Sequence, residues 1–259
     1  TRRSGLSYSL FTLAQEDHVL AYSWVPAEVH RALSECEFQL YYQPVVDTRT
    51  GETVSTEALI RWQHPWRGMI LPGPFIPVIE EMQFIVNLDL WVLGRACHEA
   101  MSMGKPVAVN ITANTIVAPD FLNKLDNVLM RSGLPPGWLT LELTERVFGS
   151  PEMMLEPLKA VHQRGIQIAA DDFGVGYSSL SSLWQYPLDK LKLDGSFIRA
   201  AALDPRAQNL VTGLVPLAKT LGITIIAECV ETEDEWTWLH DAGVFFQQGY
   251  YFARPTPFS

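Results

Sequence analysis

The sequence predicts an α/β protein, and a single closed (β/α)8 barrel of the TIM type fits it best. Strand-like and helix-like segments alternate along most of the chain, which is typical of a parallel sheet. The central strands are continuous apolar runs, as expected of strands buried on both faces. A length of 259 residues suits one such barrel, although it would also fit two smaller domains. A doubly wound open sheet is the alternative, but Gly174-Val175-Gly176 lacks the third glycine of a dinucleotide-binding turn.

The apolar runs account for eight strands, and turn or capping residues separate them from the helices. The strands are expected at residues 38–46, 54–62, 107–111, 139–143, 166–170, 190–193, 223–227 and 245–251. The helices are expected at residues 27–34, 75–82, 87–103, 119–131, 151–163, 205–221 and 233–241. A polar turn at 47–51 joins the first two strands, and a loop rich in proline and glycine at 64–74 follows the second. Gly165 stands just past the end of one helix, where glycine supplies the left-handed conformation.

The N-terminal stretch differs from the rest of the chain. Residues 1–26 carry weak structural signals and are expected to form a linker or the tail of an upstream module, followed by the barrel domain at 27–259. The chain begins with Thr1 and not with Met, so we expect it to be a piece of a longer protein. A sensory or signalling domain is expected upstream.

The amino-acid composition of the chain restricts the ligands and surfaces that it can bind. A net charge of −10 and a pI near 5.0 disfavour DNA and anionic membranes, so an anionic ligand would need neutralisation by metal ions or arginines. The three cysteines, Cys36, Cys97 and Cys229, lack metal-ligand spacing and indicate a reducing, cytoplasmic setting. No apolar run approaches the about 18 residues that span a bilayer, and no signal peptide is evident. A membrane anchor further upstream stays open.

Two adjacent acids, Asp171 and Asp172, follow the apolar strand at 166–170 and precede a loop framed by glycines. Repulsion and partial desolvation would protonate one of them unless a cation lies between them. A bridging divalent metal is the simplest resolution. In the alternative interpretation, Asp171 braces the loop and Asp172 is solvated. Ser178 or Ser179 is expected to cap a short helix beyond the loop.

Polar side chains recur where the other predicted strands end. They are Glu57, Asn110, Glu142, Glu145, Lys192, Asp194, Glu228 and Gln248. In a barrel, these strand ends meet at the rim that carries the active site. Oxygen ligands favour Mg²⁺, Mn²⁺ or Ca²⁺ over zinc, and so many acids suggest a pair of ions that share Asp171. Paired ions of this kind clamp a phosphate and activate a water, which Lys192 could orient; alternatively, Lys192 forms only a structural ion pair.

Other chemistries find no support in the sequence. The serines near residue 180 do not form a nucleophile elbow, and no Walker loop is present. Four histidines fall in predicted loops or helices and are expected at surface or capping positions: His64, His98, His162 and His240.

A set of motifs covers the chain, in order, from about Ala27 to the C-terminus. They are Glu57-Ala58-Leu59-Ile60-Arg61-Trp62, Val109-Asn110-Ile111, Leu141-Glu142-Leu143-Thr144-Glu145, Asp171-Asp172-Phe173-Gly174-Val175-Gly176-Tyr177-Ser178-Ser179-Leu180, Lys192-Leu193-Asp194, Glu228-Cys229-Val230-Glu231 and Gln248-Gly249-Tyr250. The set resembles the signature of EAL-domain cyclic di-GMP phosphodiesterases. The resemblance implies a (β/α)8 barrel with an antiparallel first strand. It also implies hydrolysis of cyclic di-GMP to linear pGpG, with two Mg²⁺ or Mn²⁺ ions, in bacterial second-messenger signalling.

The resemblance assigns roles by position. The implied metal ligands are Glu57, Asn110, Glu142, Asp171, Asp172 and Glu228. The implied catalytic residues are Lys192, as water-positioning residue or general base, Glu228, and Glu145, which would hold the loop after the fifth strand. The implied substrate contacts are Gln43, Leu59, Arg61 on a phosphate, Asp194, and Gln248 as a polar support. Ca²⁺ is expected to inhibit, because its looser coordination would misplace the attacking water.

Two residues depart from the family pattern: Cys229 stands in place of a glycine, and Leu193 in place of an isoleucine. We expect Cys229 to point into the packing behind the seventh strand and the site to stay functional. Family members that have lost the acids serve as receptors, so a catalytically weak cyclic di-GMP receptor is the alternative function. A magnesium-dependent barrel enzyme for another phosphodiester is a third.

The resemblance also implies a homodimer, formed through helices beside the fifth and sixth strands. The loop at 173–177 would then lie near the interface, and Glu145 would connect it to the metals. The sequence offers Leu180, Leu183 and Trp184 for such an interface, and these residues could equally be core.

Overall fold

The computed structural model describes residues 24–82, 84–174 and 182–258. The predicted linker therefore lies outside the described residues except for its last positions, and so do Ser178, Ser179 and Leu180. The described residues fall into two compact units. One consists of residues 24–39 and 60–88, and the other of residues 40–59 and 89–258.

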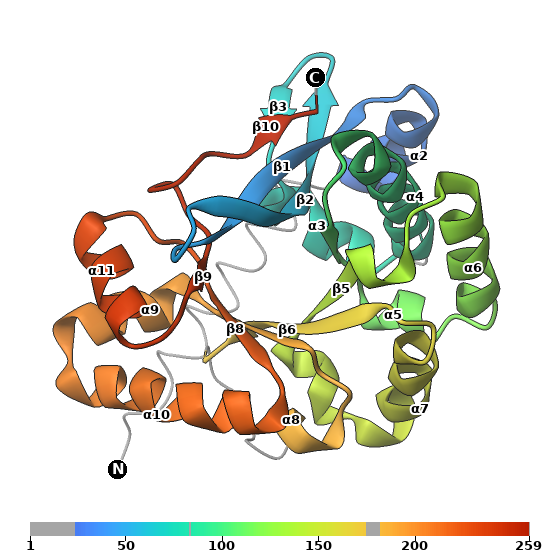
Figure 1. The fold of residues 1–259 in the computed structure, drawn as a ribbon. Helices are drawn as coiled ribbons and strands as arrows, with labels where there is room; N and C mark the ends of the chain where they lie inside the picture. The colour runs from blue at the N-terminus through green and yellow to red at the C-terminus, as the bar shows by residue number, and fades with distance from the viewer. Residues whose placement is uncertain (1–23, 83, 175–181, 259) are drawn as a thin grey trace, which may run out of the picture. The chain divides into compact units, whose positions relative to one another are not determined.

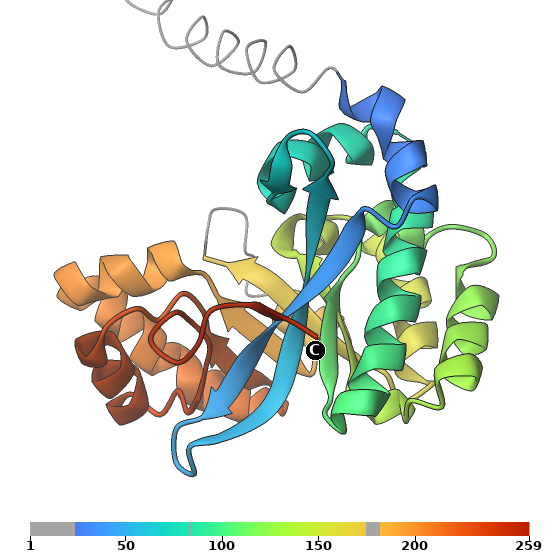
Figure 2. The same ribbon diagram turned by 90° about the horizontal axis from the view of Figure 1, so that it is seen from above.

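The smaller unit is built around aromatic side chains. Its elements are α2 (Val25–Ser34), β3 (Gly68–Ile70), α3 (Pro72–Glu80), the outer end of β2 (Glu52–His64) and the start of α4 (Ile85–Met103). Helices α2 and α3 pack against each other (Figure 2). Trp62 is fully buried, and its ring centroid lies 5.2 Å from that of Phe38 and 5.5 Å from that of Phe75. Such offset and edge contacts between aromatic rings stabilise a small core.

Of the two positions predicted for His64, surface or capping, the surface position is wrong, and the side chain instead caps backbone N–H groups. His64 is the last residue of β2 and is only 1% exposed. Its Nε2 lies 2.9 Å from Glu28 Oε2, and its Nδ1 accepts hydrogen bonds from the backbone N–H groups of Trp66 and Arg67. Because both ring nitrogens have partners, burial of this polar ring is tolerated.

The larger unit contains a closed eight-stranded barrel (Figure 1). Its strands are β1 (Phe38–Asp47), β2, β4 (Val107–Asn110), β5 (Leu139–Thr144), β6 (Gln167–Phe173), β7 (Lys190–Leu193), β8 (Thr224–Ala227) and β9 (Phe246–Gln247). Consecutive strands from β2 to β9 pair in parallel, apart from the β3 excursion, whereas β1 pairs antiparallel with β9 and closes the barrel on β2. The predicted barrel with a reversed first strand is confirmed.

Helices cover the outside of the barrel strands (Figure 1). In the larger unit they are α4 from Asp89 onward, α5 (Ala113–Ile116), α6 (Phe121–Ser132), α7 (Pro151–His162), α8 (Ser182–Gln185), α9 (Gly195–Leu203), α10 (Pro205–Leu221) and α11 (Glu233–Asp241). Two 3-10 turns, η1 (Pro136–Trp138) and η2 (Glu145–Gly149), and the short strand β10 (Thr256–Pro257) complete it. Among the described residues, no helix combines the length and apolarity needed to cross a membrane.

Most predicted elements agree with the structure, and the differences have local causes. Helix α9 was not predicted; Asp194 caps it by accepting a hydrogen bond from the Ser196 backbone N–H at 2.8 Å. The expected last strand at 245–251 is much shorter, because β9 ends at Gln247 and a turn follows. Strand β2 runs seven residues beyond Glu57, since its outer half pairs with β3 after its inner half pairs with β4.

The register of the parallel strands brings the polar strand ends to one rim. Asn110 of β4 pairs with Glu142 of β5, and Thr144 of β5 pairs with Asp171 of β6. On the other side, Leu193 of β7 pairs with Ala227 of β8, one residue before Glu228. Parallel strands therefore bring these side chains to the same rim, within about two residues of a common level, as the active site of such a barrel requires.

Candidate active site

Lys192 is the centre of the polar cluster at this rim. It points into the barrel from β7 and is only 1% exposed. Four carboxylates surround its ammonium group: Glu142 at 2.7 Å, Glu228 at 2.7 Å, Asp171 at 3.3 Å and Glu57 at 3.4 Å. The acids come from β5, the end of β8, β6 and β2. The barrel thus collects, around one cation, side chains that are far apart in the sequence.

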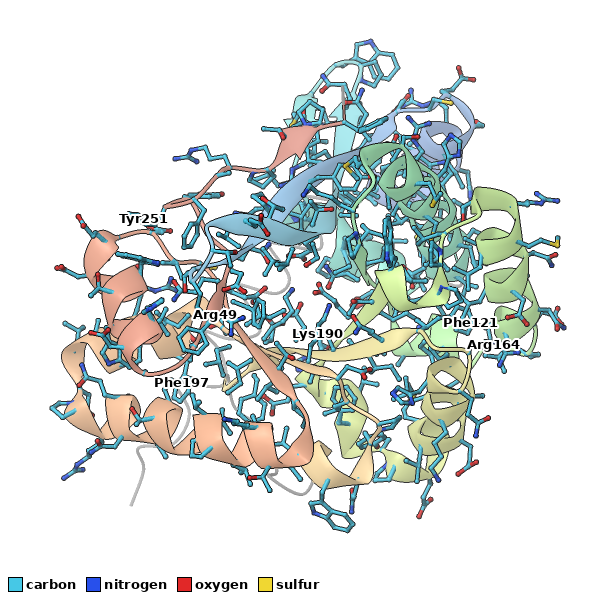
Figure 3. All side chains as sticks on the ribbon, viewed as in Figure 1. Arg49, Phe121, Arg164, Lys190, Phe197 and Tyr251 are labelled. Carbon is cyan, nitrogen blue, oxygen red and sulfur yellow. The ribbon has the colours of Figure 1, made fainter. Side chains whose placement is uncertain are left out.

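A second lysine, Lys190, precedes Lys192 by two residues in β7 and lies further from the rim. It is on the same face of β7 as Lys192, because side chains two residues apart share a face of a strand. Its Nζ donates a hydrogen bond to Thr140 Oγ1 of β5 at 2.9 Å, across the intervening strand β6. Figure 3 labels Lys190 among the central strands. The interior of the barrel below the acids is therefore polar and hydrogen-bonded.

Negative charge exceeds positive charge in the cluster. Burial raises the pKa of Glu142 well above its ordinary value. Burial, assisted by the negative charge of Asp171, raises the pKa of Glu228 to about 8. The same two causes raise the pKa of Asp172. Without another cation, protons would have to neutralise some of these carboxylates.

Glu57 and Lys192 are held in their charged forms. Burial would raise the pKa of Glu57, but the charge of Lys192 and hydrogen bonds from Gln248 and Asn110 hold it below its ordinary value. Gln248 Nε2 donates to Glu57 Oε2 at 2.7 Å, and Asn110 Nδ2 donates to Glu57 Oε1 at 2.8 Å. Burial would lower the pKa of Lys192, but the surrounding carboxylates, led by Asp171, raise it well above its ordinary value. Lys192 is therefore a charged donor in this arrangement.

The two adjacent aspartates, Asp171 and Asp172, lie within an irregularity of β6. The pairing with β7 shifts register between Ala170 and Phe173, and Asp172 has a φ of 57°. Bulges re-aim side chains, and a non-glycine residue in the left-handed region is uncommon outside functional sites. Here the irregularity lets both carboxylates approach the same space. Ligand atoms of Asp171, Asp172 and Glu228 all lie within 4.8 Å of one another.

This donor set fits hard divalent cations. The grouped atoms are carboxylate oxygens, and no histidine or cysteine of the described residues joins this group. Burial, and after it the charges of neighbouring acids, raises the pKa values of Glu142, Asp172 and Glu228, and a bound cation would favour their ionised forms. Oxygen ligation is the preference of Mg²⁺, Mn²⁺ and Ca²⁺. The residues predicted as metal ligands are thus brought together around one space.

A cavity of about 290 Å³ opens beside the cluster. Its lining includes three predicted substrate contacts, Gln43, Leu59 and Gln248, together with Glu57 and Glu228. Gln248 Nε2 also donates to Gln43 Oε1 at 3.1 Å, so these two amides are held together. A concave space next to a polar cluster is the usual setting of a small-molecule site.

Some lining residues were not predicted. They are Glu231, Gly249 and Tyr250, which stand within the quoted motifs but were given no role at the site. Their proximity to Glu228 and Gln248 in the sequence was the signal that could have identified them.

The predicted orientation of Cys229 is wrong. It does not point into the packing behind the strand; its side chain is exposed and lines the cavity. Its backbone has a φ of 54°, in the left-handed region that favours glycine. The chain direction after β8 therefore turns the thiol toward the cavity.

Three further predicted site residues occupy other positions. Glu145 begins η2, and its Oε2 accepts a hydrogen bond from the Gly174 backbone N–H at 3.3 Å, a contact suited to holding the loop after β6. Asp194 caps α9 and is not among the residues that line the cavity, so its contact with the substrate stays a prediction. Arg61 belongs to the smaller unit, where its Nη1 donates to the Ile60 carbonyl at 2.8 Å, so its contact with a phosphate stays a prediction.

Fold and site together define a class of protein: a (β/α)8 barrel with one reversed strand, whose rim carries a cluster of metal-competent acids around a buried lysine. The chain belongs to the EAL domain family, whose model matches residues 27–255.

Named relatives support this membership. The chain is 36% identical over 256 residues to the cyclic di-GMP phosphodiesterase PdeR of Escherichia coli, covering 96% of this chain and 39% of PdeR. The structure of the PaMucR phosphodiesterase in complex with c-di-GMP superposes with a TM-score of 0.85 at 35% identity, covering 90% of this chain and 97% of that one. A manganese and cyclic di-GMP complex of Klebsiella pneumoniae BlrP1 superposes with a TM-score of 0.77 at 32% identity, covering 85% and 56%. The chain spans roughly a third of the length of the curated relatives that it matches.

Proposed function

We propose that this domain hydrolyses cyclic di-GMP to the linear dinucleotide pGpG, using two divalent metal ions. The observation that carries the proposal is the cluster of Glu57, Glu142, Asp171 and Glu228 around Lys192, beside a cavity. The relatives named as phosphodiesterases, and the c-di-GMP complex of PaMucR, support the substrate. The complete set of acids favours an enzyme over a receptor.

The cluster can divide its ligands between two ions that share Asp171. Glu57, Asn110 and Glu142 would hold one ion with Asp171, and Asp172 and Glu228 would complete the other. Asn110 donates through its amide nitrogen to Glu57, which leaves the amide oxygen as its ligand atom. When bound, such ions supply a water of lowered pKa and stabilise charge on a phosphate. The manganese complex of BlrP1 supports Mn²⁺ as one such ion, with Mg²⁺ as its usual counterpart.

Lys192 would position the attacking water. Its pKa is raised well above the ordinary value, so it holds its proton and can donate hydrogen bonds. A general base must lose its proton near neutral pH, which the surrounding carboxylates oppose. Of the two roles that the resemblance allows, the positioning role therefore agrees better with the arrangement of charges.

The cavity would receive the substrate. Gln43, Leu59 and Gln248 line it next to Glu57, so the scissile phosphate would lie against the acids while these residues contact the rest of the nucleotide. Glu145 would keep the loop after β6 in place through Gly174. Arg61 would add a charged contact to a phosphate, and Asp194, at the start of α9, would add a further substrate contact.

Product analysis separates this proposal from its alternatives. The protein is incubated with Mg²⁺ and either cyclic di-GMP or cyclic AMP, and the nucleotides are separated by chromatography. Conversion of cyclic di-GMP to a linear dinucleotide, with cyclic AMP left intact, is the expected result. Binding of cyclic di-GMP without conversion would instead establish the receptor function. Equal cleavage of both nucleotides would indicate a phosphodiesterase of another specificity.

The homodimer and the upstream signalling domain also belong to this proposal. Leu183 is buried at 3% exposure, whereas Trp184 is 68% exposed and could take part in an interface. Sedimentation velocity over a wide concentration range tests the dimer. A fully active monomer throughout that range would contradict it.

A further inference from the structure

The carboxylate of Glu228 depends on a short backbone segment, residues 228–230, that leaves the end of β8. Neighbouring strands hold both ends of this segment. The Glu228 N–H donates to the Leu193 carbonyl at 3.0 Å, and the Val230 N–H donates to the Gln248 carbonyl at 3.0 Å. Cys229 lies between these two fixed points. Any displacement of Cys229 therefore has to be absorbed by Glu228 or by Val230.

Cys229 adopts a conformation that is difficult for a residue with a β-carbon. Its φ of 54° lies in the left-handed region, where the Cβ crowds the backbone. Such residues persist only where the surrounding structure leaves room and fixes the chain. The room for Cys229 has to come from a neighbouring element.

Gly195 provides that room. It is the first residue of α9, directly after the cap Asp194, and it is buried. A β-carbon added to Gly195 would overlap the Cβ of Cys229 and would lie 3.1 Å from its Sγ. It would also lie 2.9 Å from Arg199 Nη1, but that long side chain can move away at little cost. The Cβ of Cys229 cannot move without its backbone.

A second glycine restrains the other end of the segment. A β-carbon added to Gly249 would overlap the backbone nitrogen and oxygen of Val230. By contrast, one added to Gly213, within α10, would meet nothing within 4 Å. Close approach is therefore a property of Gly195 and Gly249 and not of glycines in this barrel generally.

We infer that Gly195 is a positioning residue for the proposed hydrolysis: by lacking a side chain it accommodates Cys229, and it thereby holds Glu228 beside Lys192 and Asp171. The Glu228 carboxylate lies 2.7 Å from Lys192 Nζ, so a small backbone shift would disturb the cluster. This inference rests on the proposed function, and it adds a residue that is neither among the proposed metal ligands nor among the residues that line the cavity.

The test begins with Gly195→Ala. Displacement of a reacting group by about 1 Å costs up to about 100-fold in rate, so kcat on cyclic di-GMP should fall by between about 10-fold and 100-fold. KM should change much less, because the cavity residues Gln43, Leu59 and Gln248 are not displaced. Gly213→Ala is the matched control and should retain the parent kcat, because its added methyl group meets open space.

Two double variants identify the cause. Gly195→Ala combined with Cys229→Gly removes both overlapping atoms, so its kcat should return to within about threefold of that of Cys229→Gly alone. Gly195→Ala combined with Cys229→Ala removes the sulfur but keeps the overlapping Cβ, so its kcat should stay low. If Gly195→Ala does not fold, the same contrast between the two double variants is measured by thermal unfolding.

Manganese binding, followed by electron paramagnetic resonance, makes the test independent of turnover. Mn²⁺ affinity should weaken in Gly195→Ala and in the Cys229→Ala double variant, and recover in the Cys229→Gly double variant. A parent protein that binds Mn²⁺ but cleaves no cyclic di-GMP would overturn the proposed function while this pattern of affinities still supports the pair. Equal rescue by both double variants, or unimpaired kcat and Mn²⁺ affinity in Gly195→Ala, would overturn the inference itself.

Discussion

A carboxylate oxygen of Glu228 lies 2.7 Å from Lys192 Nζ, across the pair of strands β7 and β8. The two groups are not a simple ion pair, because three further acids lie within 3.4 Å of the same ammonium group: Glu57, Glu142 and Asp171. Buried charges of one sign are costly unless cations balance them. The cluster is therefore built to hold more positive charge than Lys192 supplies, and the following predictions depend on that imbalance.

Asp171→Ala should abolish hydrolysis and leave the metal-free protein at least as stable as the parent. The substitution removes the shared ligand, and it also removes a negative charge that raises the pKa values of Asp172 and Glu228. Turnover of cyclic di-GMP and thermal unfolding in chelator are measured side by side. Glu156→Ala, at an acid whose side chain is 80% exposed, is the control for loss of one negative charge. Near-parental turnover in Asp171→Ala would show that the metal assignment is wrong.

Glu57→Ala should also abolish hydrolysis, but with a cost in stability. The change takes the closer of two acceptors from the buried amide of Gln248, which keeps only Gln43 Oε1 at 3.1 Å, and loss of a buried hydrogen-bond partner costs about 1–3 kcal/mol. Asn110 also loses its acceptor, but it is exposed and can bind water instead. Glu57→Gln keeps the size of the side chain and should recover part of the stability without recovering turnover. Thermal unfolding of the two variants measures the difference. An active Glu57→Gln variant would remove Glu57 from the ligand set.

Lys192→Met should abolish hydrolysis and destabilise the metal-free barrel. It removes the cation that, among the described residues, contacts the four carboxylates of the cluster, and removal of one partner from a buried ion pair costs about 3–5 kcal/mol. Lys159→Met provides the contrast, because its salt bridge with Glu156 is exposed and such pairs contribute at most about 1 kcal/mol. Urea unfolding in chelator gives both values. If the two substitutions cost the same, Lys192 is not the counter-ion of the cluster.

Added Mg²⁺ should stabilise the protein more at high pH than at low pH. In the metal-free protein, the pKa of Glu228 is raised from its ordinary value of 4.5 to about 8. Between these two values the folded protein keeps a proton that the unfolded chain loses, so the free energy of unfolding falls as the pH rises. Metal binding requires the ionised carboxylates, and it therefore becomes stronger over the same interval.

The rise in melting temperature on addition of Mg²⁺, compared at about pH 6 and about pH 8.5, measures this linkage. A larger rise at the lower pH would contradict the assignment of Glu228 as a ligand. The Asp171→Ala variant serves as the control, because it should show little rise at either pH.

The barrel could be predicted because its strands are short apolar runs that end in polar side chains. Lys190–Leu193 and Pro205–Leu221 were predicted with the bounds that the structure has, since alternation and capping residues are local signals. The expectation that polar strand ends converge needed only the rule that parallel strands share one rim. Which of the acids contact Lys192 depends on the register of the strands and on the bulge in β6, and neither can be read from the sequence.

The remaining features depend on long-range geometry. His64 looked like a loop residue because the partner that permits its burial, Glu28, is remote in the sequence. The orientation of Cys229 depends on the sign of its φ and on the space left by Gly195, and neither can be read from the residue type. Arg61 follows Glu57 in one motif, but it belongs to the smaller unit, whereas Glu57 and the other acids of the cluster belong to the larger unit.

The central claim is that the acids around Lys192 hold metal ions that the hydrolysis of cyclic di-GMP requires. The most direct test is metal reconstitution: the protein is stripped with chelator, supplied with cyclic di-GMP, and given Mg²⁺, Mn²⁺ or Ca²⁺ in turn while the linear product is followed. We predict no turnover in chelator, restored turnover with Mg²⁺ or Mn²⁺, and inhibition by Ca²⁺, whose looser coordination misplaces the attacking water. Hydrolysis that continues in excess chelator, or that proceeds equally well with Ca²⁺, would contradict the account.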